Sequence, residues 1–174
     1  MSGDHIFVDE SKRNGLLLAA VAVNAGRLSA ARITLRGLLL PGQRRIHFKD
    51  ERLSRKRQII RAFAQTGATA TIYVAPGPEL KARASCLAQL VRDAAAVGAH
   101  RIVIERDDSL IVHDRRALFD TVKATGHESS LRYDHLRAHE EPLLWLPDAI
   151  AWCWDHGGDW RSRITSMLTR VVRL

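Results

Sequence analysis

Two adjacent carboxylates near the start of the chain, Asp9 and Glu10, occupy a place where ionised groups are costly. They follow the apolar run Ile6–Val8, which is typical of a buried strand. Desolvating a carboxylate costs several kcal/mol unless a cation or hydrogen-bond donors compensate it. Acids at the end of such a strand therefore indicate an ion, a basic partner or an active site. A strand that simply ends in solvent at its first polar residue would give the same pattern.

Two other acids hold comparable positions. Glu105 follows the apolar run Ile102–Ile104, and Asp148 lies beside Pro147 at the start of a late helix. The carboxyl ends of parallel strands open on one edge of a sheet, where ligand sites of α/β proteins form. If the first strand is central, Asp9, Glu105 and Asp148 converge there, and their hard oxygen ligands suit Mg²⁺ or Mn²⁺ in phosphodiester cleavage. Otherwise Asp148 only complements the helix dipole and Glu105 belongs to a solvated loop.

The chain carries a strong excess of positive charge, a formal net charge of +8, and arginine supplies most of it. The guanidinium group pairs well with phosphate, and clustered cations are the footprint of a polyanion, most often nucleic acid. A solvated helix face on a basic protein is the alternative. The candidates for contact with DNA or RNA lie close together in sequence: Arg44, Arg45, His47, Lys49, Arg52, Arg55 and Lys56, with Arg57 and Arg61 beyond them.

Length and cysteine usage limit the class of protein. The 174 residues, 46% of them apolar, suffice for one compact domain over residues 1–174 and are too few for two ordinary ones. Cys86 and Cys153 lie far apart and belong to no CxxC pair, which predicts a reduced, cytoplasmic setting. The apolar run Leu16–Val23 is too short to cross a bilayer, so we expect no membrane partner.

The order of apolar and polar segments predicts an α/β fold whose sheet mixes antiparallel and parallel strands. The runs Ile6–Val8 and Leu16–Val23 flank Asn14-Gly15, a strong hairpin signal, and strands then alternate with helices. Leu28–Leu40 fits either a helix or a third strand. The other expected elements are an edge strand at 45–48, helices at 51–65, 78–97 and 114–124, strands at 69–75, 101–105 and 131–136, a helix from 147, and a last helix over 160–172.

Four tryptophans near the end of the chain have more than one interpretation. Aromatic rings there could stack on unpaired bases. Their position in and around an apolar helix favours core packing, or a subunit contact that makes the protein a homo-oligomer. The four are Trp145, Trp152, Trp154 and Trp160.

Several short motifs follow one another in an order that spans nearly the whole chain. They are Phe7-Val8-Asp9-Glu10-Ser11 with the hairpin after it, Ile46-His47-Phe48-Lys49 before a helix, Val103-Ile104-Glu105-Arg106, and Leu146-Pro147-Asp148-Ala149-Ile150-Ala151. This series resembles the domain-of-unknown-function 3800 family, which is grouped with the ribonuclease-H-like superfamily. The chain differs from the family pattern at Glu105, where Asp is common, and at Pro147, where a small residue is usual.

The resemblance implies a ribonuclease-H-like α/β fold, with a mixed sheet of five strands or slightly more and helices on both faces. It also implies a metal site made by Asp9, Glu105 and Asp148, with Glu10 as a neighbouring acidic ligand and His47 as a polar contributor. Together with the charge, this predicts a metal-dependent nuclease or phosphoryl-transfer enzyme that holds a DNA or RNA backbone without distinguishing its sequence. Two alternatives stay open: a nucleic-acid-binding or assembly module without the chemistry, and a subunit that acts only with a partner.

Overall fold

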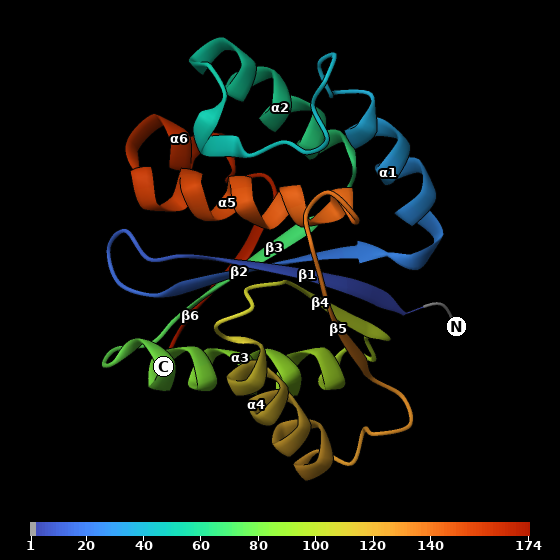
Figure 1. The fold of residues 1–174 in the computed structure, drawn as a ribbon, viewed down its shortest axis with the longest axis vertical. Helices are drawn as coiled ribbons and strands as arrows, with labels where there is room; N and C mark the ends of the chain where they lie inside the picture. The colour runs from blue at the N-terminus through green and yellow to red at the C-terminus, as the bar shows by residue number, and fades with distance from the viewer. Residues whose placement is uncertain (1–2) are drawn as a thin grey trace.

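The computed structural model describes residues 3–174, and its centre is a six-stranded mixed sheet (Figure 1). The strands lie in the order β5-β4-β1-β2-β3-β6. The β1–β2 and β2–β3 pairs are antiparallel, whereas β1–β4, β4–β5 and β3–β6 are parallel. Their bounds are β1 Asp4–Ser11, β2 Leu17–Asn24, β3 Thr69–Val74, β4 Arg101–Glu105, β5 Arg132–Leu136 and β6 Leu168–Arg173.

Helices cover both faces of this sheet. One face carries four of them, α1, α2, α5 and α6, and the other carries α3 and α4 (Figure 1). The helices are α1 Leu28–Arg36, α2 Leu53–Gln65, α3 Glu79–Ala96, α4 Ile111–Ala124, α5 Trp145–His156 and α6 Gly158–Arg163, with short 3-10 turns η1 Ala25–Arg27, η2 Phe48–Asp50 and η3 Pro142–Leu144. The expected mixed α/β architecture is confirmed.

Alternation along the strands divides the core into two parts. Phe7 and Val103 face the side of α5, whereas Ile6, Val8 and Ile104 face the side of α3 and α4. Successive side chains of a strand point to opposite faces of the sheet, so both faces of the central strands are apolar. The same alternation determines the face of the sheet toward which Asp9 and Glu105, the residues that follow these apolar runs, point.

Three segments differ from expectation or settle an open choice. The ambiguous segment Leu28–Leu40 contains helix α1 and no strand. The edge strand expected at 45–48 is wrong, because this segment leads into the 3-10 turn η2 instead of pairing with the sheet. The continuous helix expected over 160–172 is also wrong. Helix α6 ends at Arg163, and β6 pairs with the free edge of β3, where Val171 and Val172 suit an extended strand.

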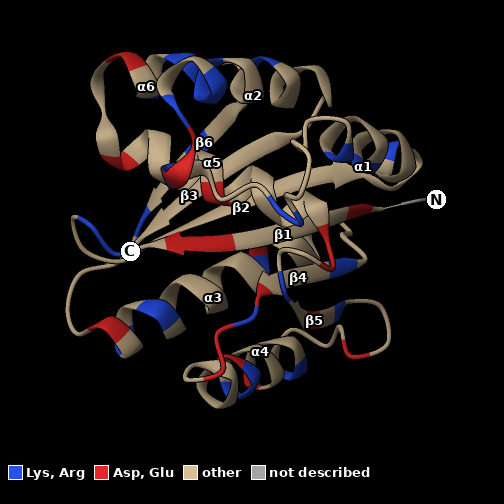
Figure 2. Cartoon of the chain, turned by 45° about the horizontal axis from the view of Figure 1, so that its top comes forward, with Lys and Arg blue, Asp and Glu red and all other residues tan. Residues whose placement is uncertain are grey.

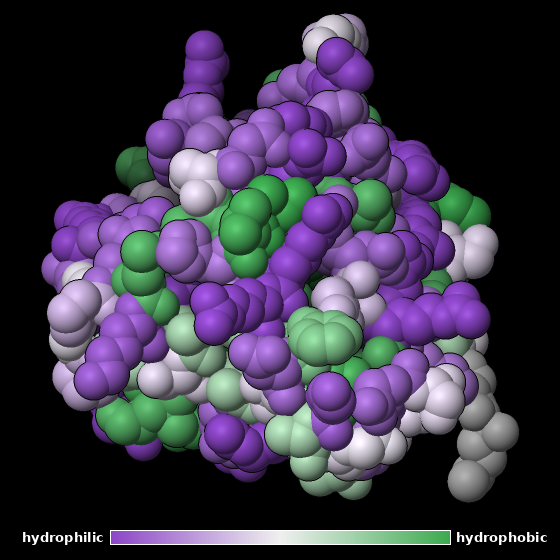
Figure 3. All heavy atoms as spheres, turned by 60° about the horizontal axis from the view of Figure 1, so that its bottom comes forward, coloured by the Kyte–Doolittle hydropathy of each residue, from purple (hydrophilic) through white to green (hydrophobic). Residues whose placement is uncertain are grey.

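The surface on the side of α3 and α4 mixes apolar and hydrophilic groups (Figure 3). Exposed apolar side chains there include Leu80, Val112 and Phe119. Within residues 3–174, none of the helices combines the length and the apolar character that crossing a membrane would need.

Candidate functional site

Asp9 and Glu105 lie side by side at the carboxyl ends of two parallel strands. The β1–β4 register pairs Val8 with Ile104, so Asp9 and Glu105 come next on the two strands. Neighbouring strands lie about 4.8 Å apart. Because Asp9 shares its face with Phe7, and Glu105 shares its face with Val103, both point toward the layer that contains α5.

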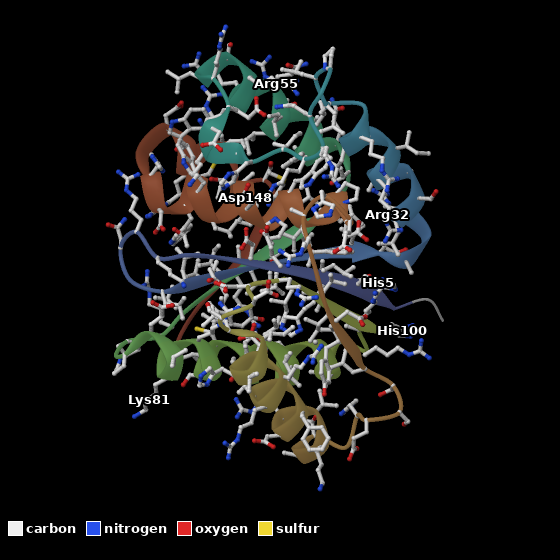
Figure 4. The ribbon with its side chains drawn as sticks, in the orientation of Figure 1. His5, Arg32, Arg55, Lys81, His100 and Asp148 are labelled. Carbon is white, nitrogen blue, oxygen red and sulfur yellow. The ribbon has the colours of Figure 1, made fainter. Side chains whose placement is uncertain are left out.

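Asp148 reaches the same edge from the first turn of α5. The apolar segment Leu143–Leu146 and Pro147 are buried, which seats the start of the helix on the sheet. The Asp148 carboxylate accepts a hydrogen bond of 2.9 Å from the backbone N–H of Phe48. In Figure 4 the label of Asp148 lies on α5, apart from the labels of His5 and His100, which lie at the amino-terminal ends of β1 and β4. The charges of Glu105 and Asp148 both act on Asp9, so the three acids predicted from the sequence lie near one another at this edge.

The electrostatics of the site reflect this crowding of acids. Burial raises the pKa of Asp9 well above its usual value, and the nearby charges of Glu105 and Asp148 raise it further. Burial also raises the pKa of Asp148, although the N–H of Phe48 works in the opposite direction. The Asp9 carboxyl group lies within hydrogen-bonding reach of Glu105. Two carboxylates this close repel each other when both are ionised, and a cation between them would relieve that repulsion.

One loop crosses this acidic edge and contacts two of the three acids. Arg45 donates a hydrogen bond of 3.0 Å to Glu105, and Phe48 binds Asp148 through its backbone. Ile46 and the Phe48 side chain are fully buried and anchor the loop in the core. The segment Arg45–Phe48 thus supplies one positive charge and one backbone donor to a cluster of three carboxylates.

Glu10 does not join the three acids, although it lines the same open pocket of about 490 Å³ as Asp9 and Glu105. It follows the alternation of Val8 and lies on the face of α3, where its carboxylate is paired with Arg83. The prediction of Glu10 as a metal ligand is thus not supported by its position, because neighbouring residues of a strand point to opposite faces.

Arg83 belongs to a buried polar network that the sequence analysis missed. It donates two hydrogen bonds to Asp114, at 2.6 and 2.8 Å, and His135 contacts the same carboxylate at 3.2 Å. Arg83 is only 1% exposed. The available signal was its helical spacing: Arg83 lies on the same face of α3 as Leu87 and Leu90, where a charged residue requires a buried partner.

The predicted nucleic-acid-binding residues fall into two groups (Figure 2 shows the charges on the fold). Arg44, Lys49 and Arg52 are exposed and available to a phosphate backbone. The others have partners inside the protein: Arg45 with Glu105, His47 with Asp50, Arg55 with Glu51 and the Leu38 carbonyl, and Lys56 with the carbonyls of Lys49 and Glu51.

Lys56 requires a correction. Only 4% of it is exposed, and its ammonium group lies over the rings of Phe48 and Trp152 at 5.7 and 4.9 Å from their centroids. A phosphate cannot reach a lysine in this position, so Lys56 is a structural cation and not a nucleic-acid contact.

The tryptophans also differ in their positions. Trp145 is buried in the core and donates a hydrogen bond of 2.7 Å to the Ala138 carbonyl. The other three, Trp152, Trp154 and Trp160, are partly buried and pack against the same core. Packing accounts for much of this cluster, while its outer side remains accessible.

The chemistry of the acidic edge suits a hard divalent cation. Its ligands are carboxylate oxygens, their negative charge exceeds the single positive charge of Arg45, and burial raises the pKa of both Asp9 and Asp148. Within the described part of the chain, however, no three His, Cys, Asp or Glu side chains are grouped closely enough to hold a metal ion as they stand. The acids therefore fit a metal in kind and charge, and binding would require a local adjustment of their side chains.

Neither protein-family models nor curated protein sequences give a match to this chain. Among solved structures, it aligns with a chain from "Structure of the PCNA:RNase HII complex from Archaeoglobus fulgidus", with a TM-score of 0.58 and 15% sequence identity. The alignment covers 88% of this chain and 73% of the other. RNase H1 from Halobacterium salinarum NRC-1 aligns over 80% of this chain and 90% of the other at 12% identity, with a TM-score of 0.38 that is too low to bear on the fold. The chain adopts a ribonuclease-H-like fold.

Proposed function

We propose that the chain is a metal-dependent nuclease or phosphoryl-transfer enzyme that acts on nucleic-acid phosphodiesters. The observation that supports this most is the meeting of three carboxylates, from β1, β4 and α5, at one edge of a ribonuclease-H-like sheet. Membership of the domain-of-unknown-function 3800 family is part of the proposal and rests on the sequence motifs.

In this proposal Asp9, Glu105 and Asp148 hold Mg²⁺ or Mn²⁺. A divalent ion bound by carboxylates can activate water and stabilise the leaving oxygen of a phosphodiester. The N–H of Phe48 keeps the Asp148 carboxylate turned toward the site. The exposed cations Arg44, Lys49 and Arg52 bind the phosphates of DNA or RNA from the neighbouring loop and turn.

The direct test replaces Asp9 by Asn and measures both metal binding and cleavage. Mn²⁺ at 100 times its dissociation constant should stabilise the wild type by about 2.7 kcal/mol through linkage. The Asp9→Asn variant should lose most of this gain, and Mg²⁺-dependent cleavage of an oligonucleotide should fall by about 100-fold or more. The matched control is Asp120→Asn, because Asp120 is an exposed acid on α4 at the other face of the sheet. Undiminished Mn²⁺ stabilisation and cleavage in the Asp9 variant would remove Asp9 from the mechanism.

A binding module without chemistry is the second candidate, and the Arg45–Glu105 ion pair is the observation that favours it. A protein cation already compensates part of the acidic charge in this arrangement. Such a module would bind polyanions with a strong salt dependence and gain no stability from Mn²⁺. The thermal titration with Mn²⁺ therefore separates the two functions before any substrate is known.

A further inference from the structure

Helix α5 carries a line of side chains that leads away from the acidic edge. Asp148, Trp152 and His156 are spaced four residues apart, so they lie on one face of the helix. Phe48 links the first two, because its N–H binds Asp148 and its ring lies 5.3 Å from that of Trp152. With a rise of 1.5 Å per residue, His156 lies about 12 Å along the helix from Asp148.

The outer end of this line is an aromatic stack. The rings of Trp152 and His156 are stacked with centroids 3.4 Å apart and an interplanar angle of 18°. The Trp152 ring is fixed from the sides by edge contacts with Phe48 and with Trp160, whose centroid lies 5.2 Å away. His156 itself is exposed. One face of the imidazole is therefore held against a rigid indole while the residue remains open to solvent.

The tip of the β1–β2 hairpin places a cation next to this stack. Ser11 donates a hydrogen bond to the Asp155 carboxylate, and Asn14 donates one of 3.2 Å to the Asp155 carbonyl. These contacts fasten the tip to the last turn of α5. Arg13, which is exposed, then reaches the Nε2 atom of His156. A positive charge beside an accessible ring matches the phosphate and the base of one nucleotide.

We propose that His156, supported by Trp152, is a stacking platform for an unpaired nucleobase, and that Arg13 takes an adjacent phosphate. The platform rests on the proposed function, and it makes the substrate a single-stranded nucleic acid or a strand that is unpaired at this point. A base inside a duplex is stacked on both faces and offers none to a protein ring. At about 3.4 Å per stacked nucleotide, the platform lies about three to four nucleotides from the acidic edge.

The experiment measures binding by fluorescence anisotropy, without divalent metal, for three probes. These are a twelve-nucleotide oligothymidylate, a strand of the same length made of abasic nucleotides, and a twelve-base-pair duplex. The wild type should bind the oligothymidylate about 5- to 150-fold more tightly than the abasic strand, the range expected for one stacked base. The change His156→Ala should remove this difference and leave binding of the abasic strand unchanged, whereas His156→Phe should keep it.

The control variant is His113→Ala, because His113 is an exposed histidine on α4 at the opposite face, and its affinities should equal those of the wild type. Thermal unfolding of each variant checks that the fold is intact. Equal binding of the oligothymidylate and the abasic strand by the wild type overturns the platform, and so does tighter binding of the duplex. If none of the probes binds, the nucleic-acid part of the proposed function fails as well, so the two failures are distinguishable.

Discussion

Arg45 offers the sharpest test of whether the acidic edge is a cation site. If Asp9, Glu105 and Asp148 bind a divalent ion, Arg45 competes with that ion, because its guanidinium group already binds Glu105. Replacing Arg45 by Gln should therefore strengthen Mn²⁺ binding. A residue that only binds phosphate would leave the affinity for metal unchanged.

The magnitude follows from the geometry of the pair. Two unit charges 3.0 Å apart attract by about 1.4 kcal/mol at a dielectric constant of 80 and by about 5.5 kcal/mol at 20. The side chains of Arg45 and Glu105 are 34% and 20% exposed, which places the net value near the weaker end. We take the net interaction free energy of the pair as about 1 kcal/mol, in line with measured exposed ion pairs. Its loss in the Arg45→Gln variant predicts about fivefold tighter Mn²⁺ binding.

The assay is calorimetric titration of Mn²⁺, together with thermal unfolding with and without the metal. Without metal the Arg45→Gln variant should unfold at a lower temperature than the wild type, because three carboxylates lose their counter-charge. With Mn²⁺ its gain in unfolding temperature should exceed that of the wild type. Arg44→Gln is the matched control, since Arg44 is exposed and precedes Arg45 directly. An unchanged or weakened affinity for Mn²⁺ in the Arg45 variant would refute competition for Glu105.

The remaining predictions concern buried charges. Asp114→Asn should lower the free energy of unfolding by about 1–3 kcal/mol in urea titrations at neutral pH, because it removes the carboxylate that accepts two hydrogen bonds from the buried Arg83 and leaves Glu10 as the remaining counter-charge. Burial alone would raise the pKa of Asp114, but hydrogen bonds from Arg83 and then His135 hold it below its usual value, so its stabilisation is present above pH ~4 and is lost as the pH falls through the lowered pKa. A wild-type protein whose acid unfolding matches that of the variant would contradict this. Lys56→Met should cost about 1–3 kcal/mol by leaving two carbonyls unpaired and should not change the salt dependence of oligonucleotide binding, whereas Lys49→Gln should reduce that slope by about one without a loss of stability.

Much of the fold was predictable because local patterns and long-range packing agree. The strand Arg101–Glu105 has the bounds expected from its apolar run, and the hairpin follows from Asn14-Gly15 between two apolar segments. The last helix expected over 160–172 failed because pairing with the edge of β3 stabilises an extended segment, and no local pattern shows a free edge elsewhere in the molecule. The segment 45–48 failed for the related reason that its apolar residues fill the core without joining the sheet.

The sequence alone was enough to propose Asp9, Glu105 and Asp148 as candidate ligands, because a carboxylate directly after a buried apolar run is unusual in any fold. It could not show that Glu10 points away from the other acids, because this depends on the direction of each side chain along the strand, nor that Lys56 is buried while Lys49 is exposed. The tertiary structure decided both points: alternation along β1 places Glu10 beside Arg83, and Lys56 is enclosed by two carbonyls and the Phe48 ring from the turn before α2, together with the Trp152 ring of α5. Charge is a property of the residue, whereas the partner that compensates it depends on which elements pack together.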